Sequence, residues 1–222
     1  MNEIEENNVE KKIESNGETV KTFNKAKVQG KIINLKEKAK EGKILLKDLI
    51  ATPLKTVKEI AEDKENKNFK IALLLIVLWA VIELMDQILY YAMSKYAEFE
   101  FLPTLKATLT PVLQVIAMSM ALYLVNDRAK DSISKVLTSV SIAYIPSIIS
   151  ALLWLLYHVS TKISYILSPI SGILSIVSLF LLYYTVKEYT KENEEATFKK
   201  FIKVVVVYYI IAFVISFLGI SI

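Results

Sequence analysis

The chain has 222 residues, of which 54% are hydrophobic and 23% are charged, and its formal net charge is +4. It has no cysteine and a single histidine, which excludes disulfides, thiolate metal sites and most histidine-based zinc sites. Apolar residues are concentrated after residue 68, in stretches long enough to cross a bilayer. We therefore predict an all-α polytopic membrane protein and not a soluble globular domain.

Residues 1–68 form a polar head, which we expect to be cytoplasmic. Residues 1–18 contain six glutamates and two lysines, a net charge of −4. We predict that residues 1–20 are disordered, because they bury too little apolar area to offset the entropy of ordering. Residues 21–58 contain eleven lysines and three acidic residues, a net charge of +8. Interleaved apolar residues predict basic amphipathic helices over residues 21–68, with a break at Gly42 and a second helix starting at Pro53.

A basic amphipathic helix beside a membrane span can lie in the membrane interface, with its lysines on anionic headgroups. Each such lysine contributes about 1 kcal/mol, so that several together would hold the head on the cytoplasmic leaflet. A solvated helix or a short coiled coil is the alternative, and either is compatible with a protein partner. Nucleic-acid binding is not expected, because acidic residues dilute the lysines and no nucleic-acid-binding motif is present. The candidate lipid-headgroup contacts are Lys36, Lys38, Lys40, Lys43, Lys47, Lys55 and Lys58.

Five apolar stretches predict a transmembrane domain of five helices over residues 69–222. They lie at about residues 69–92, 107–125, 136–158, 163–186 and 202–222. Thirteen basic residues lie just before the first stretch and in the second-to-third and fourth-to-fifth connections, whereas the opposite side has only Lys95, Lys106 and Lys162. The positive-inside rule therefore predicts a cytoplasmic N-terminus and a C-terminus outside.

Polar residues in the outer half of the first span form a candidate intramembrane site. Glu83, Asp86, Gln87 and Tyr90 follow i, i+3, i+4, i+7 spacing and share one helix face. Carboxylates at membrane depth are costly unless they are protonated, paired or hydrated. One interpretation is a proton or cation site facing the bundle interior, and the other is that the hydrocarbon ends near residues 82–84 and the acids lie among headgroups. The candidate partners of the acids are Lys95, Lys106, His158 and Lys162, although a histidine beside Trp154 and Tyr157 is also typical of the aromatic interface belt.

Small residues and prolines predict how the third and fourth spans pack. Alanines and serines line one face of the third span, and serines and a glycine cluster on the fourth, which lets the two helices approach closely and favours a hairpin. Pro146 and Pro169 lie within these spans and are candidate helix kinks, because each removes a backbone donor. Gln114 in the second span is expected to hydrogen-bond to a neighbouring helix.

Two short motifs accompany this arrangement. The segment IATPLKTVKEI before the first span contains Pro53 and Thr56 in Pro-x-x-Thr spacing, and SVSIAYIPSII in the third span contains Ile145 and Pro146. In these motifs and in the order of its features, the chain over about residues 45–222 resembles the Yip family, the Ypt/Rab-interacting multi-spanning membrane proteins, in its prokaryotic form. The resemblance implies a cytosolic N-terminal region, five spans and a short or absent tail, and in eukaryotic relatives it implies vesicle trafficking, Rab binding and membrane shaping. With 26 lysines to one arginine and the prokaryote-like motif, we expect a bacterial cell membrane.

Two functions agree with these observations. The first is a non-enzymatic membrane-organising or partner-binding scaffold, which contacts membrane lipids and a cytoplasmic protein partner or a second copy of itself. The second is a small transporter or channel component, with Glu83 and Asp86 as its coupling site and the two prolines as a gate. An enzyme is not expected, because the spans contain neither an aspartate pair nor a serine with a neighbouring base. No catalytic residue, metal or cofactor is expected either.

Overall fold

The computed structural model describes residues 40–45, 47–49, 51–63, 65–94, 98–217 and 219. These residues are α-helical or lie in short 3-10 turns and connections, and they contain no strand. The chain divides into two compact units, residues 1–47 and 48–222, each described here by itself. The predicted disorder of residues 1–20 and the candidate contacts Lys36 and Lys38 lie outside the described residues.

In the first unit, residues 40–45 are helical. The helix runs through Gly42, so the predicted break at this residue is wrong. A glycine within a helix costs only about 1 kcal/mol, which flanking helix formers readily offset. The candidate lipid contacts Lys40, Lys43 and Lys47 are all exposed.

Helix α2 (Pro53–Glu62) belongs to the second unit, together with the apolar helices. Pro53 occupies its first position, where the missing N–H would have no intrahelical partner in any case. Val57 and Ile60 are buried, and α2 packs against α5 and α7, whereas Lys55 and Lys58 are exposed. The sequence places α2 in the head and allows its apolar side to face lipid. In the structure this apolar side faces α5 and α7.

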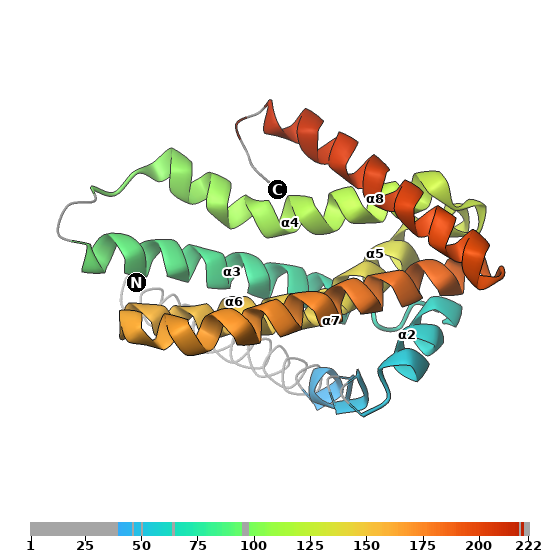
Figure 1. Ribbon diagram of the computed structural model, residues 1–222, viewed down its shortest axis with the longest axis horizontal. Helices are drawn as coiled ribbons and strands as arrows, with labels where there is room; N and C mark the ends of the chain where they lie inside the picture. Colours follow the sequence, from blue (N-terminus) through green and yellow to red (C-terminus); the bar gives the residue numbers. More distant parts are fainter. Residues whose placement is uncertain are drawn as a thin grey trace, which may run out of the picture. The chain divides into compact units, whose positions relative to one another are not determined.

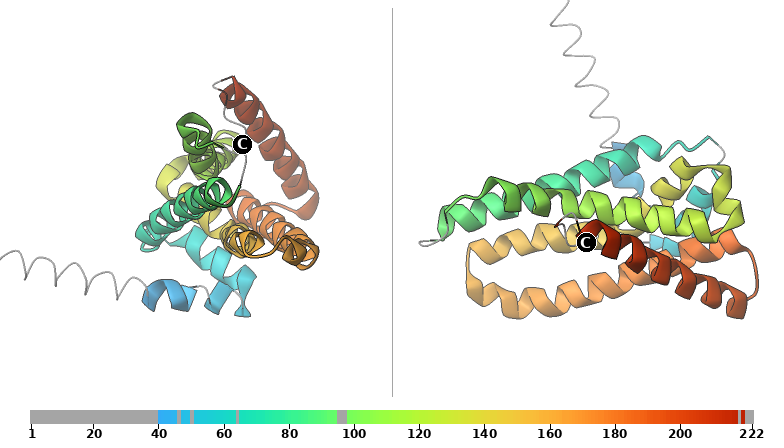
Figure 2. Two further views of the ribbon diagram at one scale, coloured as in Figure 1. Left: turned by 90° about the vertical axis from the view of Figure 1, so that its left-hand side faces the viewer. Right: turned by 90° about the horizontal axis from the view of Figure 1, so that it is seen from above.

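The second unit is a bundle in which the long helices run alternately in opposite directions, while two shorter helices, α5 and α6, follow one another along one direction (Figure 1). Its helices after α2 are α3 (Phe69–Met93), α4 (Phe101–Val125), α5 (Ile133–Ala143), α6 (Ile145–Trp154), α7 (Ser164–Thr190) and α8 (Glu194–Ser216). Three 3-10 turns, η1 (Asp127–Asp131), η2 (Leu155–His158) and η3 (Thr161–Ile163), lie in the connections. Helix α3 packs against α4, α4 against α8, and α6 against α7, as the two views of Figure 2 also show.

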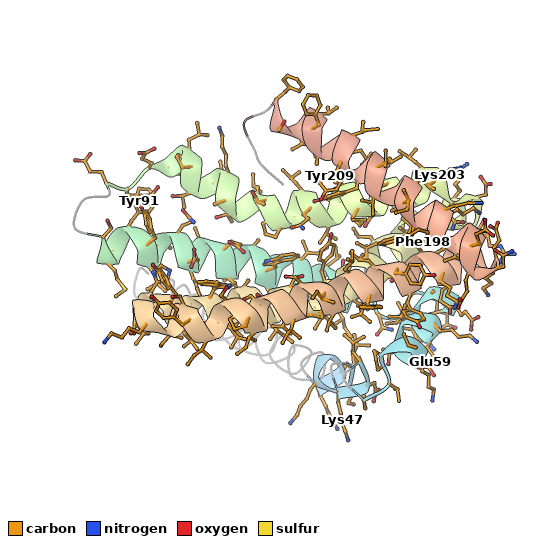
Figure 3. All side chains as sticks on the ribbon, in the orientation of Figure 1. Lys47, Glu59, Tyr91, Phe198, Lys203 and Tyr209 are labelled. Carbon is orange, nitrogen blue, oxygen red and sulfur yellow. The ribbon has the colours of Figure 1, made fainter. Side chains whose placement is uncertain are left out.

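The alternating directions give the bundle two distinct ends. Helix α2, η1, the starts of α3, α5 and α8 and the ends of α4 and α7 lie together at what we call the basic end. The end of α3, the start of α4, η2, η3 and the start of α7 lie at what we call the His158 end. In Figure 3, Phe198 and Lys203 mark the basic end and Tyr91 marks the His158 end.

Within the described residues, three helices, α3, α4 and α7, are long and apolar enough to cross a membrane. A fourth span results if α5 and the segment from Ile145 to His158 are taken as one helix bent by 46°. Many large apolar side chains point away from the bundle, such as Val77 at 58% and Phe180 at 61% exposure. So much exposed apolar surface is unfavourable in water and is compatible with an integral membrane protein.

The predicted starts of two spans lie six or more residues after the observed helix starts. Helix α4 begins six residues before the predicted start at 107, so that the predicted 93–106 loop is reduced to residues 94–100. Helix α8 begins eight residues before the predicted start at 202, because Asn193 caps it: its Oδ1 accepts a hydrogen bond of 2.9 Å from the Ala196 N–H. Hydropathy locates only the apolar part of α8, whereas its capped polar first turns extend the helix toward Asn193.

The third predicted span is interrupted in the middle. Helix α5 ends at Ala143, Tyr144 forms a turn, and α6 begins at Ile145 with Pro146 in its first turn. Pro146 has no N–H, so the carbonyl of Ile142 loses its usual donor four residues later. By contrast, α7 continues as one helix through Pro169.

Serine pairs join α6 to α7. The hydroxyls of Ser147 and Ser178 are 2.8 Å apart, and Ser150 donates to Ser171 at the same distance. The expected hairpin of the third and fourth predicted spans is therefore confirmed. Gln114 of α4 shares side-chain hydrogen bonds with Tyr144 and Tyr208, which confirms its expected interhelical role.

Candidate functional site

Asp86 and His158 form the central contact of the candidate site. Asp86 lies on α3, about 10 Å before the helix end at 1.5 Å per residue, and His158 closes η2 after α6. The Nε2 atom of His158 lies 2.8 Å from Oδ1 of Asp86. The histidine side chain is only 10% exposed and the aspartate 34%. Of the four candidate partners of the acids, the structure thus brings His158 to Asp86.

Glu83 lies one turn before Asp86 and has a different partner. Its Oε1 accepts a hydrogen bond of 3.2 Å from Nε1 of Trp79, one turn earlier on α3. The sequence reasoning missed Trp79, although the i, i+4 spacing of an indole donor and a carboxylate would have been sufficient to propose this bond.

A cavity of about 380 Å³ lies beside these groups. Of the predicted site residues, Glu83, Asp86 and Tyr90 line it, together with Trp154, Tyr157 and His158 from the α6–η2 segment. Gln87 is half-buried and is not among the lining residues. The predicted face of α3 therefore contributes three of its four polar residues to one concave site.

The other candidate partners do not neutralise the acids. Neither Lys106 nor Lys162 forms an ion pair with Glu83 or Asp86 in the part of the chain that the structure describes. Lys95 lies outside the described residues. The cavity therefore keeps a negative charge whenever both acids are ionised, because His158 supplies one positive charge at most.

A second, polar cavity of about 540 Å³ lies at the basic end. Its lining includes charged residues of both signs, among them Glu62 of α2 and Lys191, whose ion pair measures 3.2 Å between Oε1 and Nζ. This ion pair ties α2 to the segment that follows α7. The cavity contains as many acidic as basic residues, so it has no net preference for an anion.

At the same end, Lys130 and Asp127 form an ion pair of 2.7 Å within η1. The hydrogen bond and the positive charge of Lys130 lower the pKa of the Asp127 carboxyl, and the same hydrogen bond and the negative charge of Asp127 raise the pKa of Lys130. Both groups are exposed, so this pair orders a surface turn and contributes little to the stability of the bundle.

The fold and the cavity define a class: an all-α protein with several helices long and apolar enough to span a membrane, and with a carboxylate–histidine site at one end. No protein-family model, no curated protein and no solved structure matches the chain. Any more specific function must therefore be argued from the residues themselves.

Proposed function

We propose that the chain is a five-span, non-enzymatic membrane protein of Yip-like type, which acts as a membrane-organising or partner-binding scaffold through a basic cytoplasmic head. The main support is the distribution of basic residues in the bundle. Twelve of them lie at the basic end in the described segments, whereas only Lys106 and Lys162 lie at the His158 end. A bias of this kind orients membrane proteins with the basic end in the cytoplasm.

The proposal includes α8 as the fifth span. Helix α8 carries Lys199, Lys200 and Lys203 near its start. Because of these charges, it is not among the helices that are apolar enough over a membrane-spanning length. From Val204 onward the chain has no charged residue. The N-terminus would then be cytoplasmic and the C-terminus outside, in a bacterial cell membrane.

Fluorescent reporters fused to the two ends test the orientation. A reporter that is fluorescent only in the cytoplasm should be active at the N-terminus and inactive at the C-terminus. Activity at both ends would refute the five-span topology.

The absence of native cysteine permits a clean test of the head. A single spin label at position 41 (Glu41→Cys) in the full chain should contact lipid-soluble relaxation agents in phosphatidylglycerol nanodiscs more than in phosphatidylcholine nanodiscs. This difference should shrink at 0.5 M salt, because screening weakens attraction to anionic headgroups. The Lys40→Gln/Lys43→Gln/Lys47→Gln variant should lose it, whereas the control Lys162→Gln should not. Equal accessibility in both lipids would refute lipid binding by this segment.

A second candidate function is a small transporter or channel component with its carboxylate site on α3. The observation that favours it is the Asp86–His158 contact beside a cavity. In addition, the outward-facing residues of α3 beside the acids are apolar, with Met85 and Ile88 both exposed. This pattern favours hydrocarbon on the outer side of α3 at the depth of the acids, and not a headgroup environment.

Ion flux in proteoliposomes tests this candidate. Glu83→Gln and Asp86→Asn should each abolish proton or cation flux, whereas Glu98→Gln, a change of an exposed acid at the same end, should leave it intact. If the wild-type protein carries no flux, the transporter function is refuted and the scaffold function is unaffected.

A further inference from the structure

The cavity at the His158 end combines acidic groups with aromatic walls. Glu83 and Asp86 come from α3, whereas Trp154 and Tyr157 come from α6 and η2. The rings of Trp154 and Tyr157 are in edge contact with centroids 5.9 Å apart, and the Tyr157 ring lies at the same distance from that of His158. Three neighbouring rings, those of Trp154, Tyr157 and His158, therefore line the side of the cavity that α6 and η2 contribute.

The protein leaves this cavity short of positive charge. Glu83 uses Oε1 to accept from Trp79, and Asp86 uses Oδ1 for His158. The second oxygen of each carboxylate has no hydrogen-bond partner among the described residues. With both acids ionised, the site carries a net charge of −1 or −2, depending on His158. The ligand that complements this charge is a cation.

The wall chemistry selects the kind of cation. A metal ion usually requires several protein ligands, and the described residues contain no group of three or more acidic or histidine side chains placed to hold one. Ring faces attract ammonium groups through the aromatic quadrupole, most strongly for tryptophan. A volume of about 380 Å³ also lies in the range of small-molecule pockets.

We propose that this cavity binds a small organic ammonium ion, held by Glu83 and Asp86 and enclosed by Trp154 and Tyr157. Such a group occurs in free amines and in the headgroups of zwitterionic lipids, and the chemistry of recognition is the same for both. The inference names a substrate class for the second candidate function, and it rests on that function for any transport of the ion. Choline binding without ion flux would support the proposed ligand and refute only the transporter function.

The two tryptophans of the chain make the site observable. Trp154 lines the cavity, and Trp79 bonds to Glu83 next to it, and the sequence contains no others. We expect choline to change the tryptophan fluorescence of the full-length protein saturably in phosphatidylglycerol nanodiscs, whose lipid has no ammonium group. The uncharged isostere 3,3-dimethylbutan-1-ol should give no change over the same concentrations. Trp154→Phe should remove most of the choline response.

Lipid composition distinguishes the two sources of the ammonium group. If a lipid headgroup occupies the cavity, transfer to phosphatidylcholine nanodiscs should by itself produce the fluorescence change. Choline added to these nanodiscs should then cause no further change. If the ligand is a free amine, choline should titrate equally in both lipids. Either result supports an ammonium site.

Variants test which residues hold the ligand. Glu83→Gln and Asp86→Asn should each weaken choline binding about tenfold or more, because each removes one negative charge beside the ammonium group. The matched controls Glu98→Gln and Glu100→Gln, exposed acids at the same end, should change affinity less than about twofold, since salt screens charges that lie outside the cavity.

Three results would overturn the proposal. The first is no saturable response to choline or to phosphatidylcholine in the wild-type protein, a test that requires no variant to fold. The second is an equal response to the uncharged isostere, which would indicate a merely apolar cavity. The third is a full choline response in Trp154→Phe, which would place the ligand elsewhere.

Discussion

Asn126, where α4 ends, offers a quantitative test of how the basic end is held together. The residue is only 2% exposed. Its Nδ2 donates to Oγ1 of Thr190 at the end of α7 over 3.0 Å, and its Oδ1 accepts from the Arg128 N–H over 3.2 Å. One side chain thus joins α4, η1 and α7. We choose Asn126→Ala as the perturbation because it removes both bonds at once.

The expected loss of unfolding free energy for Asn126→Ala is about 2 to 3 kcal/mol. Thr190 is buried, so its hydroxyl loses a partner that water does not replace, at a cost of about 1 to 2 kcal/mol. The Asn126 side chain also caps η1 through the Arg128 N–H, and the loss of such a cap typically costs about 1 kcal/mol. Arg128 is exposed, so water recovers part of this second bond.

Unfolding by SDS in mixed micelles, followed by tryptophan fluorescence, would measure the effect. A double-mutant cycle with Thr190→Val should give a coupling energy of about 1 kcal/mol between the two side chains. Asn68→Ala is the matched control, because Asn68 precedes α3 without a side-chain capping bond. A change below about 0.5 kcal/mol for Asn126→Ala, or strict additivity in the cycle, would refute the assigned role.

Three further predictions concern packing and charge. Val57→Ala in α2 should destabilise the bundle by about 2 kcal/mol in the same assay, because Val57 is buried. The control Leu54→Ala, at an exposed position, should have little effect. Equal effects would show that α2 does not pack through its Val57 side. Ser150→Ala should cost about 0.6 to 1.7 kcal/mol, as is typical of hydrogen bonds between spans, and no measurable cost would mean that the hydroxyl pair is not formed. Lys130→Ala should raise the pKa of Asp127 toward about 3.9 in an NMR titration. The pKa of Asp127 is lowered in the folded protein. The ion pair therefore favours the folded state at pH values above the ordinary carboxyl pKa, and this effect is lost as the pH falls through the lowered pKa.

The long apolar helices are the part of the fold that the sequence predicts best. The first predicted span, 69–92, differs from α3 by a single residue, because apolar residues run along nearly the whole of this helix. The early start of α8 depends on polar residues and on the Asn193 cap, to which hydropathy is blind. The docking of α2 depends on partners more than 60 residues away, so its buried side cannot be assigned from its own amphipathic pattern.

The candidate site shows the same limit. Spacing alone placed Glu83, Asp86 and Tyr90 on one face of α3, and these three line the cavity. Spacing offered four partners for the acids, and only the way that η2 meets α3 selects His158. The role of Asn126 was missed for the same reason, because its partner Thr190 lies 64 residues away.

The interruption at Tyr144 has a consequence for the order in which the bundle assembles. Pro146 offers no N–H to the Ile142 carbonyl in a straight or a bent helix, and at the break this carbonyl accepts from the Tyr144 N–H instead. The break and its flanks, Ile142 to Pro146, are almost completely buried, and α3, α4 and α7 pack against α5. The bend is therefore set by contacts that form when the neighbouring helices close around this segment, and we expect it to reach its final angle late in assembly.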